Sequence, residues 1–218
     1  MTFDDYRQVG ERLMGEADEL YVSIDVEGDG PAGYGSLASI GAVAATGEEF
    51  YAEVAPQRQT YFPECRSFID SLGMSREYLA KNGRALEEVG RQMRRWADEL
   101  RERYGKPLVA MMFNAGYDWA HIDLMFARAA DAYPEAFPSR GIDGQPHCNP
   151  FGISPLDSKS LALCLDEKAW SWRATERRHL PDFVVPPIDV THHALEDARR
   201  QLQQCYAMVG YLSARSSR

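Results

Sequence analysis

The pattern of apolar and polar residues near the start of the chain predicts three β-strands. Residues 20–26 (LYVSIDV) are mostly apolar or β-branched and run into an acidic, glycine-rich stretch, which is typical of a strand that ends in a loop. Residues 36–45 and 48–55 have a similar composition and meet at the dipeptide Thr46-Gly47, which favours a turn. The three segments are therefore predicted to form an antiparallel meander.

Helical spacing of apolar residues dominates much of the remaining chain. It predicts helices over residues 3–20, 76–81, 85–104, 118–130 and 194–212. Gly105 and Pro107 mark the end of the third helix, because glycine adopts the left-handed cap conformation and proline cannot continue a helix. The apolar run at residues 108–113 (LVAMMF) is typical of a strand that is buried on both faces.

Three stretches are less regular. Residues 56–75 and 133–155 are predicted to be irregular, and residues 156–165 fit either a strand or a helix. An initial meander followed by alternating strands and helices indicates the α/β class, with a mixed sheet covered by helices on both faces. The length favours one domain over residues 1–218.

The chain shows neither the pattern of a membrane span nor that of a leader. Its first residues are polar and acidic, and no run approaches the roughly 18 apolar residues of a spanning helix. The four cysteines lack C-x-x-C spacing and histidine partners, so we expect unpaired thiols at Cys65, Cys148, Cys164 and Cys205. A cytoplasmic protein without membrane association is expected.

The first predicted strand ends in two acidic residues. Asp25 and Glu27 are two positions apart, so their side chains project from the same face of the strand. Two carboxylates at that separation repel each other, and burying them is costly unless a cation is bound. The pair indicates a site for a hard divalent metal ion; the alternative is an acidic strand end that faces solvent.

Two further acidic residues lie near the starts of predicted helices. Asp118 follows the strand at residues 108–113, four positions after Asn114, and Asp197 follows His192 and His193. Each has a simpler explanation, because a carboxylate in a first turn stabilises the helix dipole and paired histidines at a helix start are often surface residues. Taken separately, these residues do not establish a site.

The order of the motifs along the chain is more informative than any one of them. SIDVEGDGP at residues 23–31 is followed by SLASIGAVA, then by FNAGYDWAHIDLM, and finally by HHALEDAR at residues 192–199. Together they resemble the DEDD superfamily of 3′–5′ exonucleases, in the histidine-containing DEDDh branch that includes the polymerase proofreading subunit, RNase T and oligoribonuclease. The resemblance spans about residues 20–210 and implies an RNase H-like fold.

The resemblance also implies roles for the polar residues. The expected ligands of two divalent cations, Mg²⁺ or Mn²⁺, are Asp25, Glu27, Asp118 and Asp197. Helical spacing alone would place His193 on the same side as Asp197, whereas the histidine of the family stands five positions before its aspartate. We therefore expect His192 to be the general base that accepts a proton from water.

The implied reaction is hydrolysis of phosphodiester bonds at the 3′ end of single-stranded RNA or DNA, with release of nucleoside 5′-monophosphates. The residues expected to bind substrate are Gly28, Gly30, Asn114, Tyr117 and Arg177. Gly-Asp-Gly-Pro after Glu27 replaces the usual two threonines and glycine, so a side-chain hydroxyl contact would be lost. Aromatic residues expected to stack on bases are Tyr34, Tyr117, Trp119, Trp170 or Trp172.

The net charge modifies this expectation. A formal charge of −9 is unusual for a protein that binds nucleic acid, although two divalent cations would place four positive charges where the phosphate lies. Weak, distributive binding is therefore expected, and the spacing of the terminal helices permits a homodimer. The alternative functions are a nucleic-acid- or partner-binding module with weak catalysis, and a hydrolase of small phosphate esters.

Overall fold

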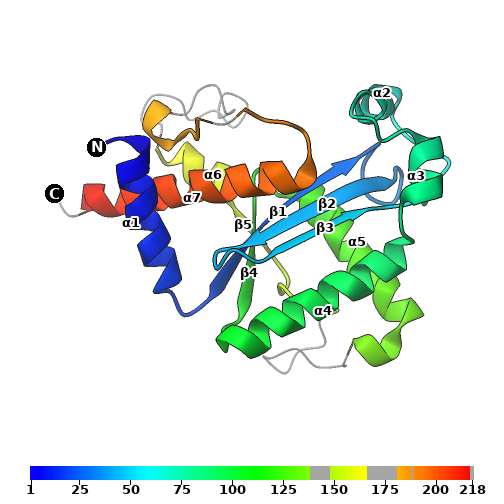
Figure 1. Cartoon of the computed structure of the whole chain (residues 1–218), viewed down its shortest axis with the longest axis horizontal. Coiled ribbons are helices and arrows are strands. Elements are labelled where there is room, and N and C mark those ends of the chain that lie inside the picture. Colours follow the sequence, from blue (N-terminus) through cyan, green and yellow to red (C-terminus); the bar gives the residue numbers. More distant parts are fainter. Residues whose placement is uncertain (138–147, 166–180, 188, 217–218) are drawn as a thin grey trace.

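A mixed sheet of five strands forms the centre of the structure, a computed structural model that describes residues 1–137, 148–165, 181–187 and 189–216 (Figure 1). The strands lie in the order β3-β2-β1-β4-β5. Their bounds are Leu20–Gly28 (β1), Leu37–Ala44 (β2), Glu49–Glu53 (β3), Leu108–Met112 (β4) and Leu156–Asp157 (β5). The first three strands pair antiparallel, which confirms the predicted meander, and β4 pairs parallel with both β1 and β5.

Helices cover both faces of this sheet (Figure 1). Their bounds are Phe3–Gly15 (α1), Pro63–Ser71 (α2), Arg76–Asn82 (α3), Leu86–Tyr104 (α4), Gly116–Ala132 (α5), Ser158–Leu163 (α6) and Ala194–Ser216 (α7). Val22, Ile24 and Val26 of β1 pack in one apolar core with α4 and α5. On the other face, Ser23 accepts a hydrogen bond from Gln201 of α7 at 2.9 Å. The predicted α/β class, with helices on both faces, is confirmed.

The ends of the long helices follow local sequence signals. In the capping box that starts α1, the Asp5 amide donates to Thr2 Oγ1 at 3.3 Å and the Thr2 amide donates to Asp5 Oδ2 at 2.7 Å. This helix ends at Gly15, earlier than predicted, and β1 begins at Leu20. The end of α4 is as predicted, because Gly105 follows it in the left-handed conformation at φ 64°.

Three segments differ from the sequence-based expectation. Residues 56–75 are predicted to be irregular, but they contain the nine-residue helix α2. The buried residues of α2 are only Arg66 and Ile69, so its helical spacing is weak in the sequence. Residues 156–165, which fit either a strand or a helix, form β5 and then α6. A 3₁₀ turn at Pro134–Ala136 interrupts the region predicted to be a loop.

The first and last helices of the chain pack against each other on one face of the sheet, as Figure 1 shows for α1 and α7. Their backbones approach closely because glycine occupies the crossing point on both helices. A Cβ atom at Gly10 would overlap the carbonyl group of Tyr206, and one at Gly210 would overlap that of Tyr6. The N-terminal and C-terminal regions of the chain are thereby joined.

Candidate active site

The two acidic residues at the end of β1 lie on the face of the sheet that α7 covers. Asp25 and Glu27 share the side of the strand that carries Ser23, which is bonded to α7. On β2, Gly41 pairs with Asp25 and Ser39 pairs with Glu27. A Cβ atom at Gly41 would overlap the backbone of Leu195, so glycine allows the first turn of α7 to lie directly on the sheet beside the two carboxylates.

Asp197, in the first turn of α7, is held by the backbone that precedes the helix. Its Oδ1 accepts a hydrogen bond from the Thr191 amide at 3.2 Å, and its Oδ2 accepts one from the His192 amide at 2.9 Å. The residue is 3% exposed. These bonds orient the carboxylate and fold the segment before α7 back toward it.

The side chains of Glu27, His192 and Asp197 meet in one cluster. One possible ligand atom of each lies within 4.8 Å of those of the other two, and His192 Nδ1 lies 3.9 Å from Glu27 Oε1. Two carboxylates this close repel each other, which favours the binding of a cation between them. Because carboxylate oxygens are the ligands that Mg²⁺ and Mn²⁺ prefer, the cluster fits a divalent metal ion.

The rings of the two neighbouring histidines lie in different environments. The ring of His192 lies beside Glu27, with the ring of Phe68 edge-on to it at a centroid distance of 4.7 Å. The ring of His193 instead stacks on Tyr51 of β3, with centroids 4.6 Å apart and planes inclined by 18°. Of the two, His192 is therefore the one whose ring lies at the carboxylates.

Asp118, the third acidic position, lies at the same end of β1 but outside the cluster of three. Its Oδ1 accepts a hydrogen bond from the Val26 amide at 3.0 Å. That position of β1 is open to α5 because the pairing of β1 with β4 stops at Ser23. Asp25 also lies outside the cluster found among the described residues, two positions before Glu27 on the same face of β1.

Two residues of the predicted site have a backbone conformation that side chains rarely adopt. Asn114 has φ 63° and His192 has φ 55°, and among the described residues no other non-glycine residue has a positive φ. The Asn114 amide donates to Asp157 Oδ1 at 3.0 Å. Such conformations cost roughly 1–3 kcal/mol each and are typical of functional sites. Both turns lead directly into helices that carry predicted metal ligands.

The loop after Glu27 is held by two side chains of α5. The Tyr117 hydroxyl donates to the Gly30 carbonyl at 3.1 Å, and His121 Nε2 lies 3.0 Å from the same oxygen. Burial lowers the pKa of His121 and raises the pKa of Tyr117. A Cβ atom at Gly28 would lie 2.7 Å from the Tyr117 hydroxyl oxygen. The loop predicted to bind the terminal nucleotide thus has a fixed shape; Arg177 lies outside the described residues.

A buried ion cluster, which was not predicted from the sequence, holds the other side of this loop. Asp29 Oδ2 lies 3.2 Å from Arg66 Nη1 of α2 and 3.1 Å from Arg76 Nη1 of α3. Asp29 Oδ1 accepts a hydrogen bond from the Ser36 amide at 2.6 Å. Asp29 is 1% exposed. No local pattern could reveal this cluster, because both arginines are distant from Asp29 in the sequence.

Replacing Asp29 with asparagine is expected to lower the free energy of unfolding by about 3 kcal/mol, because it leaves the buried guanidinium of Arg66 without its buried partner. Urea denaturation of the wild-type and variant proteins measures this loss. The matched control is Asp70→Asn, since Asp70 also pairs with Arg66 but its side chain is 47% exposed. That variant should lose less than about 1 kcal/mol. Equal losses in the two variants would contradict the role of the buried cluster.

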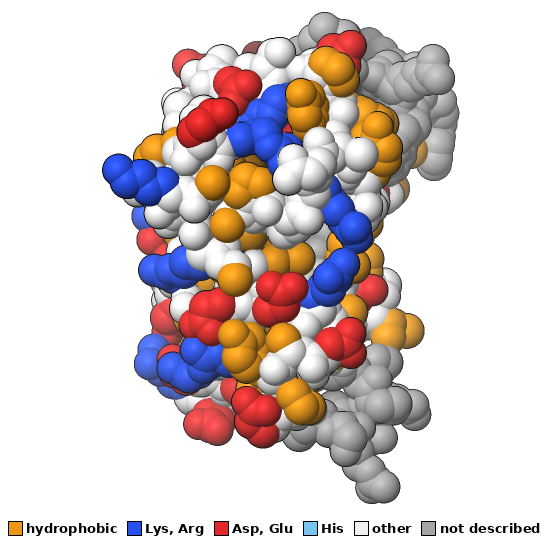
Figure 2. All heavy atoms as spheres, turned by 90° about the vertical axis from the view of Figure 1, so that its right-hand side faces the viewer, with side chains coloured by type: hydrophobic (Ala, Val, Ile, Leu, Met, Phe, Trp, Pro, Cys, Tyr) orange, Lys and Arg blue, Asp and Glu red, His pale blue; other side chains and the backbone are white. Residues whose placement is uncertain are grey.

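Exposed aromatic side chains gather at the end of the molecule that carries α2 and α3. Tyr34 and Phe62 pack with ring centroids 5.3 Å apart, and Phe68 contacts His192. Tyr34 is 47% exposed, Phe62 43% and Phe68 38%. Figure 2, which views this end, shows hydrophobic side chains interspersed with both basic and acidic ones. Phe62 and Phe68 were missed because α2 was not predicted.

The aromatic residues predicted to stack on bases have different environments. Tyr34 belongs to the exposed group at this end, whereas Tyr117 is bonded to the loop and Trp119 packs against the core beneath α4 and α5. Trp170 and Trp172 lie outside the described residues. Within the described part of the chain, Tyr34 is therefore the predicted stacking residue with the most accessible ring.

A curated relative is similar to most of the chain. The 3′–5′ DNA exonuclease Cap18 of Escherichia coli is 30% identical over 189 residues, which cover 85% of this chain and 89% of the relative. No protein-family model matches the chain.

Solved structures of low sequence identity share the fold. The nuclease domain of 3′hExo, a DEDDh family member solved with bound rAMP, has a TM-score of 0.59 at 12% identity, covering 88% of this chain and 92% of that chain. Escherichia coli Exonuclease I in complex with a dT13 oligonucleotide has a TM-score of 0.58 at 13% identity, covering 91% of this chain and 42% of that chain. The fold is thus RNase H-like, as the sequence motifs imply. Because it is 30% identical to Cap18 over most of both chains, and shares the fold of a DEDDh family member, the chain belongs to the DEDDh family of 3′–5′ exonucleases.

Proposed function

We propose that the chain removes nucleotides from the 3′ end of single-stranded DNA and releases nucleoside 5′-monophosphates. The observation that carries this proposal is the meeting of Glu27, Asp197 and His192, which joins metal-binding oxygens with a proton acceptor at one end of the sheet. The preference for DNA over RNA is supported by the name of the relative Cap18, a 3′–5′ DNA exonuclease.

The proposed cofactors are two divalent cations, Mg²⁺ or Mn²⁺. Their proposed ligands are Asp25, Glu27, Asp118 and Asp197. The proximity of Glu27 to Asp197 supports this choice, as does the position of Asp25 on the same face of β1. When bound, such cations activate a water molecule and neutralise charge on the phosphoryl and leaving oxygens. The fixed orientation of Asp197 by two backbone amides reduces the entropy lost when a ligand binds.

His192 is proposed to take the proton from the attacking water. Its side chain is 48% exposed, so the ring meets solvent on one side and Glu27 on the other. The hydrogen bond from its own amide to Asp197 holds the backbone of His192 next to that carboxylate. General base catalysis of this kind contributes roughly 10²- to 10⁴-fold to the rate.

The terminal nucleotide is proposed to bind against the loop after β1 and the turn before α5. The proposed contacts are Gly28, Gly30, Asn114, Tyr117 and Arg177. The loop is held rigidly by Tyr117 and His121, which supports a site that accepts a free 3′ end in one orientation. The exposed rings of Tyr34, Phe62 and Phe68 are proposed to stack on the neighbouring bases, because stacking tolerates any base sequence.

The net charge of −9 supports weak, distributive binding of the nucleic acid.

We propose a cytoplasmic location. Among the described residues, no helix combines the length and the apolar character that a membrane span requires. The spacing of apolar residues in the terminal helices, which permits a homodimer, also serves the packing of α1 against α7 within one chain.

The proposal is tested with 5′-labelled single-stranded DNA and RNA oligomers of the same sequence, incubated with Mg²⁺, Mn²⁺ or EDTA. We expect a ladder that shortens from the 3′ end, faster on DNA than on RNA, and no shortening in EDTA or with the Asp25→Asn variant. Equal or faster degradation of RNA would refute the DNA preference. Hydrolysis of small phosphate esters in preference to oligomers would favour a phosphatase, and binding without shortening would favour a binding module.

A further inference from the structure

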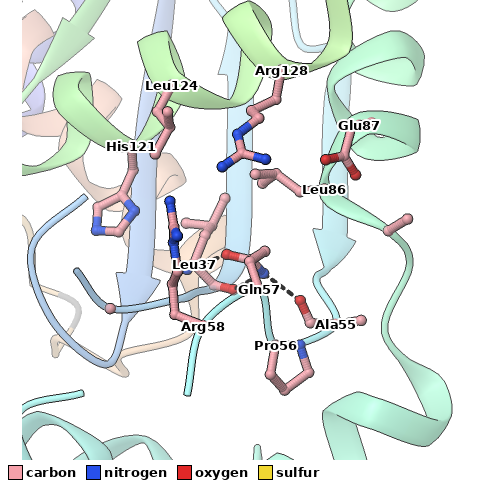
Figure 3. A pocket seen from close by; sticks show the side chains of 12 residues that line it. Leu37, Ala55, Pro56, Gln57, Arg58, Leu86, Glu87, His121, Leu124 and Arg128 are labelled. Carbon is pink, nitrogen blue, oxygen red and sulfur yellow. Dashed lines mark hydrogen bonds between the residues drawn. The ribbon is translucent and has the colours of Figure 1, made fainter. Parts of the chain in front are cut away.

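A cavity of about 270 Å³ lies on the α4–α5 face of the sheet (Figure 3). The cluster of Glu27, His192 and Asp197 lies on the α7 face, so the two sites are distinct. The walls of the cavity come from the loop between β1 and β2, the start of β2, the segment after β3, the start of α4 and one side of α5. Gly35 and His121, which border it, both contact the loop that follows Glu27.

Two arginines supply the positive charge of this cavity. Figure 3 shows Arg58, from the segment after β3, and Arg128, from α5, extending into the cavity from opposite sides. The backbone of Arg58 is fixed, because its amide donates to Ser36 Oγ at 3.0 Å and its carbonyl accepts a hydrogen bond from Arg76. Within the described part of the chain, neither guanidinium forms a salt bridge. Two guanidinium groups directed at one space form a binding site for an anion such as phosphate.

The start of α4 adds to the anion-binding character. Ala85, the N-cap residue of this 19-residue helix, forms no side-chain cap, and the first residues of the helix line the cavity. The first amides of a helix carry partial positive charge and bind anions. Glu87 opposes this effect, since its carboxylate is the acidic group among the lining residues.

Apolar residues and two polar ones, Gln57 and His121, complete the walls, and the cavity is small. Leu37, Leu86 and Leu124 line it together with Pro56. Pockets for drug-sized ligands occupy about 300–1,000 Å³, so a volume of about 270 Å³ suits a smaller molecule. An anionic group at the arginines and a flat apolar group against the leucines would together fill such a space.

We propose that this cavity is a second, non-catalytic site, which binds a small phosphate-bearing ligand of the nucleoside monophosphate class. The phosphate lies between Arg58 and Arg128, and the base packs against the leucine side chains. The ligand contacts Gly35 and His121, and these two residues in turn contact the loop after β1. This proposal concerns binding alone and does not require that the chain hydrolyse nucleic acid.

Isothermal titration calorimetry of the full chain in EDTA tests the proposal, because chelation removes the divalent cations from the catalytic cluster. The probes are dAMP, inorganic phosphate and deoxyadenosine. We expect dAMP to bind more tightly than inorganic phosphate, and deoxyadenosine not to bind measurably. Hydrogen bonds to charged groups are worth about 1.5–3 kcal/mol, so Arg128→Gln and Arg58→Gln should each raise the Kd for dAMP by about 10- to 100-fold.

Charge-matched variants separate a specific site from general electrostatics. Glu87→Gln should lower the Kd for dAMP several-fold, because it removes the acidic group from the cavity. Arg95→Gln and Glu99→Gln change exposed residues of α4 that do not line the cavity, and should change the Kd by less than twofold. Arg128 is exposed, so its replacement is not expected to alter the melting temperature.

The proposal would be overturned if dAMP gave no heat of binding, or if Arg128→Gln and Arg95→Gln had equal effects on the Kd. Loss of dAMP binding in Glu27→Gln would overturn it as well, because that result would place dAMP at the catalytic cluster. Tighter binding of an oligomer than of dAMP, abolished by Arg128→Gln, would also overturn it by assigning the cavity to a nucleic-acid strand. The oligomer-shortening assay on the same preparation reports the hydrolytic function separately, so failure of one proposal does not imply failure of the other.

Discussion

Replacing Glu27 with glutamine is expected to lower kcat/KM for hydrolysis at a 3′ end by about 10³-fold or more, while stabilising the protein in the absence of metal. Metal ions stabilise the transition state of such reactions by several kcal/mol, and each 1.36 kcal/mol corresponds to tenfold in rate. Glutamine preserves the shape of the side chain but removes the negative charge beside Asp197 and His192. The loss should therefore appear in the rate rather than in the fold.

The predicted gain in stability has the same origin. Glu27 and Asp197 repel each other when no cation is bound, so the variant should melt at a higher temperature than the wild type in EDTA. Added Mg²⁺ or Mn²⁺ should raise the melting temperature of the wild type but have little effect on the variant, because a ligand stabilises only the state that binds it. Glu102→Gln, at an exposed position of α4, is the control and should change neither property. An active Glu27→Gln enzyme would contradict the proposed metal site.

Removing the imidazole of His192 is expected to lower the rate of the chemical step by about 10²- to 10⁴-fold, and removing that of His193 by no more than a few-fold. Glycine is the informative replacement at position 192, because the backbone there has φ 55° and glycine adopts this conformation without strain. The variants His192→Gly and His193→Gln are compared in single-turnover assays with saturating metal ion.

Chemical rescue distinguishes a missing base from a distorted site. Added imidazole should restore part of the activity of His192→Gly, since the His192 side chain is 48% exposed and its removal leaves a space that solvent can reach, and should have no effect on the wild type or on His193→Gln. His193 stacks on Tyr51, away from the carboxylates. If His193→Gln proved to be the inactive variant, the assignment of the base to His192 would be wrong.

The sheet and the first half of the site could be predicted because their signals are local. The alternation of residues along β1 places Asp25 and Glu27 on one face, and that prediction needs only the period of a strand. The turn between β2 and β3 and the end of α4 at Gly105 are likewise encoded in a few neighbouring residues.

The parts that could not be predicted depend on contacts between distant segments. α2 is stabilised through Arg66, which pairs with the buried Asp29, and a charged residue leaves no apolar pattern to detect. Helical spacing also fails to identify which of the two histidines lies at Glu27, for a different reason. α7 begins at Ala194, so His192 and His193 both precede the helix, and the four-residue period does not apply to them. The hydrogen bonds from the backbone to Asp197 decide which ring meets Glu27.

The docking of α7 on Gly41 and against α1 also determines when the active site can form during synthesis. The chain emerges from the ribosome with its N-terminal segments first. The segment that forms β1, with Asp25 and Glu27, has therefore already been synthesised while Asp197 and the histidines are still to be translated. Because two of the three residues of the cluster, His192 and Asp197, come from the segment before α7 and from its first turn, a nascent chain lacks the proposed hydrolytic centre. With the site as proposed, we expect nuclease activity only after α7 has been translated, so the incomplete chain would not attack nucleic acid near its own ribosome.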